Sequence, residues 1–359
     1  MPILGLLKTI YEPLASFFFF THFTNLSLSS PVSISTTYRS TRRHKSEMQN
    51  HTKITLFILR GLTDDPQLQI LIFIFLFLTC MLSVIGNLTI ITLTLMDPHL
   101  KTPMYFFLRN LSFLELSIIN TYIPRYLYSM STGDNTISRN ACFTQMFFVV
   151  FFGATDFFLL AIMSYDRYVA ICKPLHYTSI MNNRICNQFL LGCWLTALMI
   201  ILPPLSLALQ LEFCDSNVID HFGCDVFPLL EIVCSDTKLI EMTVLFCAVF
   251  ILIIPLLLVL LSYGYIIKTI LRFPSAQQRK KAFSTCSSHI IVVSMTYGSC
   301  IFQYLKLSTN DGVAFNKVLS MLTVSMIPSV NPFIYSLRNK QVIQAFKDSV
   351  KRITFFLKH

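Results

Sequence analysis

The chain has 359 residues, of which 54% are hydrophobic and only 13% charged, and its mean hydropathy is +0.62. A soluble protein normally carries about 25% charged residues, so this composition excludes an ordinary water-soluble globular fold. The net charge of +10 comes from short basic runs between apolar segments, which indicates membrane topology and argues against a nucleic-acid-binding face.

The amino-terminal segment differs in composition from the rest of the chain. Residues 1–47 hold a short apolar patch, a Ser/Thr-rich stretch and a basic cluster, and we expect them to form a disordered extension. Residues 48–68 are expected to be an extracellular segment. Within it, Asn50 opens an Asn-His-Thr sequon, which predicts N-glycosylation on the outer side of the membrane.

Seven stretches are long enough to cross a bilayer. A hydrocarbon core about 30 Å thick needs roughly 20 apolar residues in a helix, because lipid cannot satisfy backbone polar groups. Five stretches contain no Asp, Glu, Lys or Arg, and they cover 66–96, 185–211, 242–267, 282–305 and 318–337. Two more, 102–124 and 140–165, are as long but carry Arg109, Glu115 and Asp156. The sequence therefore predicts an all-α membrane protein with a seven-helix transmembrane domain over 69–337.

Loop charge gives the orientation of these spans. The stretch 268–281 holds five basic residues and no acid, whereas 210–241 holds seven acids and one base. Basic loops remain in the cytoplasm, so at the plasma membrane the amino end is expected outside and the carboxyl end inside. In the last stretch, 338–359, apolar residues recur at helical spacing among basic ones, which predicts a short amphipathic eighth helix on the membrane; they are Val342, Ala345, Phe346 and Val350.

Four polar residues lie within four different spans: Asn87, Glu115, Asp156 and Asn331. Ionisable groups inside a membrane mark function by default, and one polar cluster inside the bundle would explain all four. Hydrogen bonds between helices account equally well for the two asparagines. Two neighbouring carboxylates require protonation or a bound cation. We therefore hypothesise a Na⁺ or proton site at Glu115 and Asp156, and we expect no other metal site.

Four cysteines lie on the predicted outer side, namely Cys142, Cys214, Cys224 and Cys234. This compartment is oxidising, so they can form two disulfides. Spacing alone leaves all three connectivities open.

A run of ten residues, Met163 to Cys172 (MSYDRYVAIC), ends the third span, and Pro174 to Tyr177 (PLHY) follow it. Further motifs appear in order along 48–350: Gly86-Asn87, Lys101 to Leu108 (KTPMYFFL), Ser262-Tyr263, Lys281 to His289 (KAFSTCSSH) and Asn331 to Tyr335 (NPFIY). Together they resemble the vertebrate odorant (olfactory) receptors within the rhodopsin-like G-protein-coupled receptors, and most closely family 6, subfamily C. The chain departs from that pattern at Glu115, where Asp is usual, at Asp156, where Glu is usual, and at Pro328-Ser329-Val330.

The resemblance implies a rhodopsin-like bundle that binds an odorant and activates a stimulatory, olfactory-type heterotrimeric G protein, which raises cAMP. It implies that Arg167 is held by Asp166 at rest and freed on activation. The other residues that the resemblance assigns to this switch are Tyr168, Tyr263 and Tyr335. It also selects two disulfides, Cys142–Cys224 and Cys214–Cys234.

Candidate ligand-binding residues lie in the outer halves of three spans. In the third span Val150, Gly153, Ala154 and Phe157 share one helix face by their spacing. The fifth and sixth spans would present Cys247, Ile251, Tyr297, Cys300, Ile301 and Tyr304. Ordinary helix packing suits the same spacing, and the resemblance favours a pocket because that family binds odorants there. Since no charge lies at this level of the third span, the expected ligand is small, volatile and uncharged, and an amine or anion would lack a partner.

Other function classes fit less well. The chain shows no metal-ligand spacing, nucleophile elbow or glycine-rich phosphate loop, so neither an enzyme nor a cofactor is expected. It shows no internal repeat, which argues against inverted-repeat transporters. A receptor that does not couple to a G protein stays open if the amino-terminal extension blocks export. The expected partners are a small-molecule odorant, a G protein and membrane lipid, without nucleic acid.

Overall fold

The computed structural model describes residues 55–358 except 214–215, 307–311 and 338. The expected extension 1–47, the sequon at Asn50 and the cysteine Cys214 lie outside the described residues. The side chain of Tyr304 also lies outside them.

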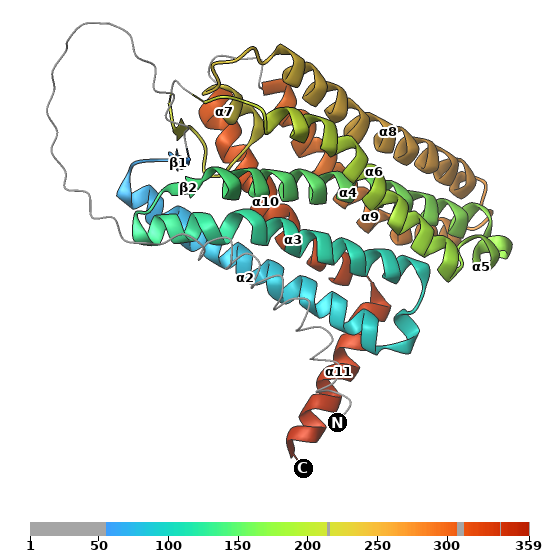
Figure 1. The fold of residues 1–359 in the computed structure, drawn as a ribbon. Coiled ribbons are helices and arrows are strands. Elements are labelled where there is room, and N and C mark those ends of the chain that lie inside the picture. The colour runs from blue at the N-terminus through green and yellow to red at the C-terminus, as the bar shows by residue number, and fades with distance from the viewer. Residues whose placement is uncertain (1–54, 214–215, 307–311, 338, 359) are drawn as a thin grey trace, which may run out of the picture.

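Seven helices of 26 residues or more run side by side through the described part of the chain (Figure 1). They are α2 (Pro66–Met96), α3 (Pro103–Thr132), α4 (Arg139–Cys172), α6 (Asn183–Ala208), α8 (Lys238–Leu271), α9 (Ala276–Lys306) and α10 (Gly312–Leu337). Among the described residues, all of these except α3 contain a stretch that is long and apolar enough to cross a membrane. The predicted seven-helix bundle is confirmed.

Two helices, α3 and α4, carry charged residues within their predicted spans, and the sequence of α3 is the less apolar of the two. It contains Arg109 and Glu115, and it packs against both α2 and α4. Fourteen of its residues are buried, including Glu115 at 3% exposure. Because neighbouring helices cover much of α3, fewer of its side chains contact lipid, and its sequence can be less apolar than that of helices at the edge of the bundle.

Side-chain caps determine where several helices begin. The Asp65 carboxylate accepts a hydrogen bond from the Gln67 amide at 2.9 Å, and Pro66 occupies the first turn of α2. Asn182 caps α6 in the same way through the Ile185 amide at 3.0 Å. At the other end of a helix, Gly133 adopts φ +74° and ends α3, a conformation that glycine tolerates without strain.

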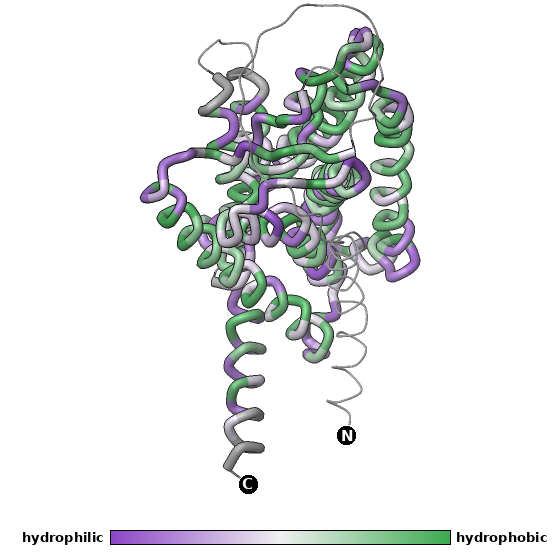
Figure 2. Tube along the Cα trace, turned by 60° about the vertical axis from the view of Figure 1, so that its left-hand side comes forward, coloured by the Kyte–Doolittle hydropathy of each residue, from purple (hydrophilic) through white to green (hydrophobic). Residues whose placement is uncertain are grey.

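The long helices are largely hydrophobic along their length (Figure 2), and many of their exposed residues are large and apolar. On α8, Leu245, Phe246 and Leu261 expose more than half of their surface. In the interior, α2 and α10 approach closely at Gly86, where an added Cβ would lie 2.9 Å from the Cβ of Pro332. Lipid is therefore the solvent of the outer surface, and small residues allow close packing inside.

A three-stranded sheet caps one end of the bundle. The strand β1 (Leu56–Leu59) lies in the middle, antiparallel to β2 (Thr136–Ser138) and parallel to β3 (Val218–Ile219). Phe57 and Ile219 are fully buried beneath it. No sequence pattern predicts this sheet, and 48–68 was expected only to be an extracellular segment.

Short elements complete the fold. They are η1 (Pro98–Leu100), η2 (Pro174–His176), α5 (Tyr177–Ile180) and α7 (Val226–Leu230). The last helix, α11 (Lys340–Lys358), leaves the opposite end of the bundle crosswise to the long helices (Figure 1). Its Val342 and Ala345 are 3% exposed, whereas Phe346 and Val350 remain largely exposed. This amphipathic helix matches the one predicted from the spacing of its apolar residues.

Candidate ligand cavity and switch

A cavity of about 410 Å³ lies between α4, α6, α8, α9 and α10, below the loop that joins α6 to α8. Seven of the ten predicted ligand-binding residues line it: Val150, Gly153, Ala154, Phe157, Cys247, Ile251 and Cys300. At Gly153 an added Cβ would meet no atom within 4 Å. The backbone of α4 therefore borders open space at this point.

Tyr297 lies behind the floor of the cavity and does not line it. Its ring packs edge-on against Phe157 with 4.9 Å between ring centroids, and only 3% of the residue is exposed. Movement of the Phe157 ring would therefore displace the ring of Tyr297, which is on a different helix.

The expectation that Ile301 faces the cavity is wrong. Its side chain is 45% exposed and is absent from the cavity wall. Successive residues of a helix are about 100° apart, so α9 cannot direct both Cys300 and Ile301 at the same point. The face of α9 that carries Cys300 continues instead to Gln303, which does line the cavity.

The expectation that an amine would lack a partner is also wrong, whereas an anion would meet only a lysine that is already paired. One side of the cavity is polar, and its residues come from the loop and from the ends of α9 and α10: Asp220, His221, Asp225, Glu231, Gln303, Asn316, Lys317 and Ser320. Lys317 forms an ion pair with Asp220, with 2.6 Å between Nζ and Oδ1. The sequence shows the acids of this loop, but without the fold they indicate only the orientation of the spans.

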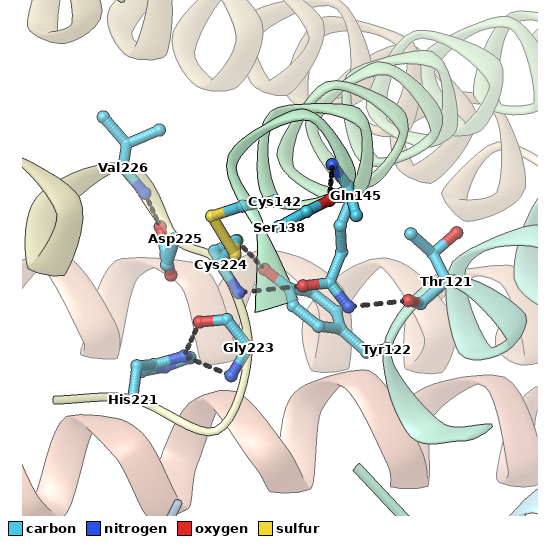
Figure 3. The surroundings of a disulfide bond; sticks show 11 residues. Thr121, Tyr122, Ser138, Cys142, Gln145, His221, Gly223, Cys224, Asp225 and Val226 are labelled. Carbon is cyan, nitrogen blue, oxygen red and sulfur yellow. Dashed lines mark hydrogen bonds between the residues drawn. A yellow bond between two sulfur atoms is a disulfide. The ribbon is translucent and has the colours of Figure 1, made fainter. Parts of the chain in front are cut away.

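A disulfide holds the loop against the bundle (Figure 3). Cys142 of α4 is bonded to Cys224, which confirms this predicted pairing. Around it, the Gln145 side chain accepts a hydrogen bond from the Cys224 amide at 2.9 Å and donates one to the Thr121 carbonyl at 2.9 Å. The Tyr122 hydroxyl donates to the Cys224 carbonyl at 3.0 Å. The loop is therefore pinned to both α3 and α4.

Two further features of this loop bear on the predictions. Cys234 is disulfide-bonded, but Cys214 lies outside the described residues, so the pairing of these two stays a prediction. His221 is 4% exposed and its ring stacks on Phe222. Burial lowers the pKa of His221 below its ordinary value of 6.5, although Asp225 acts in the opposite direction. The imidazole is therefore neutral at neutral pH.

The intramembrane polar residues are only partly connected by hydrogen bonds. The Asn331 amide donates to Glu115 at 2.5 Å. The Asn87 amide donates to the Pro328 carbonyl at 3.0 Å. In the described part of the chain, Oδ1 of Asp156 is buried without a hydrogen-bond partner, as is Oδ1 of Asn331. The cluster therefore contains buried acceptors that no described protein group satisfies.

The end of α4 remote from the cavity carries the predicted switch. Arg167 forms an ion pair with Asp166, and both are buried. The other Asp166 oxygen accepts a hydrogen bond from the Tyr177 hydroxyl at 2.8 Å. Burial, followed by the Asp166 charge, raises the pKa of Tyr177, so its hydroxyl keeps its proton. Asp166 thus engages the Arg167 guanidinium, which is the contact that the resemblance assigns to the resting receptor.

His289, the last residue of the motif 281–289, joins three helices. Its Nδ1 lies 2.7 Å from the Tyr263 hydroxyl, and its Nε2 lies 3.2 Å from the Leu160 carbonyl. It therefore links α9 to both α8 and α4. The other predicted switch tyrosines make no such link: Tyr335 has a buried hydroxyl without a partner among the described residues, and Tyr168 packs on Tyr265.

Comparison with known proteins identifies the family. The family model for olfactory receptors matches residues 73–354. Human olfactory receptor 6C2 is 70% identical over 311 residues, which cover 87% of this chain and 100% of that protein. Human olfactory receptor 6C68 is 65% identical over the same shares of the two chains. The crystal structure of squid rhodopsin matches with a TM-score of 0.64 at 17% identity, over 80% of this chain and 87% of that one, and it supports the fold alone. The chain belongs to the olfactory receptor family of G-protein-coupled receptors, which are multi-pass membrane receptors and not enzymes.

Proposed function

We propose that this receptor binds small, largely apolar volatile molecules in the 410 Å³ cavity and then activates a stimulatory, olfactory-type G protein, which raises cAMP. The single observation that carries the proposal is the position of the two sites on α4. Gly153 and Phe157 line the cavity, and Asp166 and Arg167 form the ion pair at the other end of the same helix. One helix therefore touches both the ligand space and the coupling residues.

The proposed activation step is an exchange of partners at Arg167. A ligand that displaces Phe157 would move Tyr297 on α9, because the two rings are in contact. Outward movement of α9 would break the link from His289 to Leu160 of α4 and open a space beside Arg167. A helix of the G protein α subunit would then occupy that space. Rigid-body motion of packed helices is a common form of such transitions.

The proposed orientation places the sheet and the cavity outside the cell and α11 inside. The basic residues at the adjoining ends of α8 and α9, including Lys268 and Arg279, would then face anionic lipid and the G protein. An epitope at the carboxyl terminus should be detected only after the cells are permeabilised. Detection on intact cells would refute this orientation.

The buried acceptors of Glu115, Asp156 and Asn331 support the further proposal of a Na⁺ or proton site that differs between the resting and active states. Carboxylate and amide oxygens suit a hard cation, and a bound charge would offset the cost of burying two carboxylates.

The test is a cAMP assay with an odorant panel, in cells that express the chain with and without residues 1–47. We expect at least one odorant to raise cAMP in a dose-dependent way. Arg167→Ala should abolish the response while surface expression remains. The matched control is Val318→Ala, because Val318 is 44% exposed on the outside of α10. A response that survives in Arg167→Ala would refute the proposed coupling.

A further inference from the structure

The cavity has two chemically different walls. The wall formed by α4, α6 and α8 is apolar and includes Val150, Ala154 and Ile251. The opposite wall is polar and includes Gln303, Asn316 and Ser320. A ligand that fills this space therefore contacts hydrocarbon on one side and hydrogen-bonding groups on the other.

The polar wall offers mainly acceptors. Three carboxylates line it, those of Asp220, Asp225 and Glu231, against the single cation Lys317. That cation is already engaged by Asp220. A ligand carboxylate would meet two further acids here and a lysine that is not free, so an anion is disfavoured.

One acceptor in this wall is unused. The Oδ1 atom of Asn316 is buried and has no hydrogen-bond partner among the described residues. The Gln303 amide, on the same wall, donates to the Ser320 hydroxyl at 2.5 Å. A buried acceptor without a donor costs free energy, which a bound donor would recover.

Building on the proposed odorant function, we propose that the preferred ligands are amphipathic molecules with a hydrogen-bond donor at one end, and that Asn316 is the residue that selects them. The donor, an O–H or N–H group, binds the Asn316 carbonyl. The hydrocarbon part lies along α4, against Gly153 and Ala154. Alcohols, phenols and amines share this chemistry, whereas ethers and carboxylates of the same chain length lack it.

The test uses matched probes of one chain length: octanol, methyl octyl ether, octanoate and octylamine. Binding is measured on the purified full-length receptor by thermal stabilisation, which does not depend on G-protein coupling, and cAMP is measured in parallel. Octanol should bind about tenfold more tightly than the ether, the value expected for one hydrogen bond to a buried acceptor. Octanoate should bind most weakly. Octylamine tests whether the acids of the wall also favour a cationic donor over a neutral one.

Variants locate the effect. Asn316→Leu should remove the preference for octanol over the ether, while Asn316→Asp should keep it, since aspartate retains an acceptor. Asn120→Leu is the matched control, because Asn120 lies on α3 outside the cavity wall and donates to the Leu116 carbonyl. Equal binding of octanol and ether by the wild type would refute the inference, and so would equal loss of both in Asn316→Leu. A receptor that discriminates in binding but raises no cAMP would refute the proposed coupling and leave this inference standing.

Discussion

The loop between α6 and α8 covers the cavity and is called the lid below. Replacement of Gly223 by alanine should destabilise this lid more than any glycine-to-alanine change in the lipid-facing helices. A Cβ at this position would lie 2.4 Å from Cε1 and 2.5 Å from Cδ1 of Tyr122. Ordinary contact begins near 3.4 Å, so the ring would have to retreat by about 1 Å (3.4 − 2.4). Tyr122 has little room for this, because it is 5% exposed and packs against Phe222.

The expected cost has two parts. Forcing an extra methyl group into a packed interior costs about 1–3 kcal/mol. Displacing the ring would also break the hydrogen bond from the Tyr122 hydroxyl to the Cys224 carbonyl, which is worth about 1 kcal/mol. We therefore expect Gly223→Ala to lower the free energy of unfolding of the lid region by about 2–4 kcal/mol.

The assay is the melting temperature of the purified receptor, with surface expression as a second measurement. Gly192→Ala is the control, because a Cβ at Gly192 meets nothing within 4 Å and alanine favours the helix. In a Tyr122→Ala background the clash is absent, so Gly223→Ala should then have little further effect. Equal stability of Gly223→Ala and Gly192→Ala would refute the reasoning, and so would additive losses in the double variant.

Three further predictions concern the cavity, the lid and the polar cluster. Gly153→Leu fills open space beside α4, so the EC50 of the bulkiest agonists should rise at least about tenfold while small agonists are spared; a uniform change would contradict this. The folded receptor binds a proton at His221 less readily than the unfolded chain, so the stability that neutral His221 contributes should decline as pH falls below 6.5. His221→Phe should therefore show a weaker pH dependence in melting curves taken from about pH 7.5 to 5.5. A steeper dependence in that variant would contradict the assignment. Glu115→Gln and Asp156→Asn should remove the effect of replacing Na⁺ by choline on agonist potency, and an unchanged effect in both would exclude a Na⁺ site there.

The transmembrane architecture could be predicted from the sequence because lipid leaves so few solutions for the backbone. An uninterrupted apolar run such as 242–267 has to be a spanning helix. The ends of the helices were less predictable. The helix α8 extends from Lys238 to Leu271, beyond both ends of the apolar run. Helical hydrogen bonding continues into the polar interface, where an apolar composition no longer marks the helix.

The sheet and the polar wall could not be predicted because they depend on contacts between distant parts of the chain. The strand β1 at Leu56–Leu59 pairs with residues 136–138 and 218–219, and no local pattern in so short a segment specifies those partners. Likewise, Asp220 reaches the cavity because the Cys142–Cys224 bond folds its loop back over it, and Asn316 reaches the cavity from a different segment, at the start of α10. Sequence spacing located the apolar wall, which lies on continuous helices, and missed the wall assembled from separate segments.

The composition of α3 has a consequence for biosynthesis. Its sequence carries Arg109 and Glu115 where a lone helix would face hydrocarbon, and both the buried carboxylate and the helix surface rely on α2, α4 and Asn331 of α10. A nascent chain that ends shortly after Thr132 should therefore enter the endoplasmic reticulum membrane poorly at this segment, and insertion should improve once α4 has been synthesised. The stable insertion of α3 then depends on helices that are synthesised after it, and cellular quality control would act on the receptor at this step.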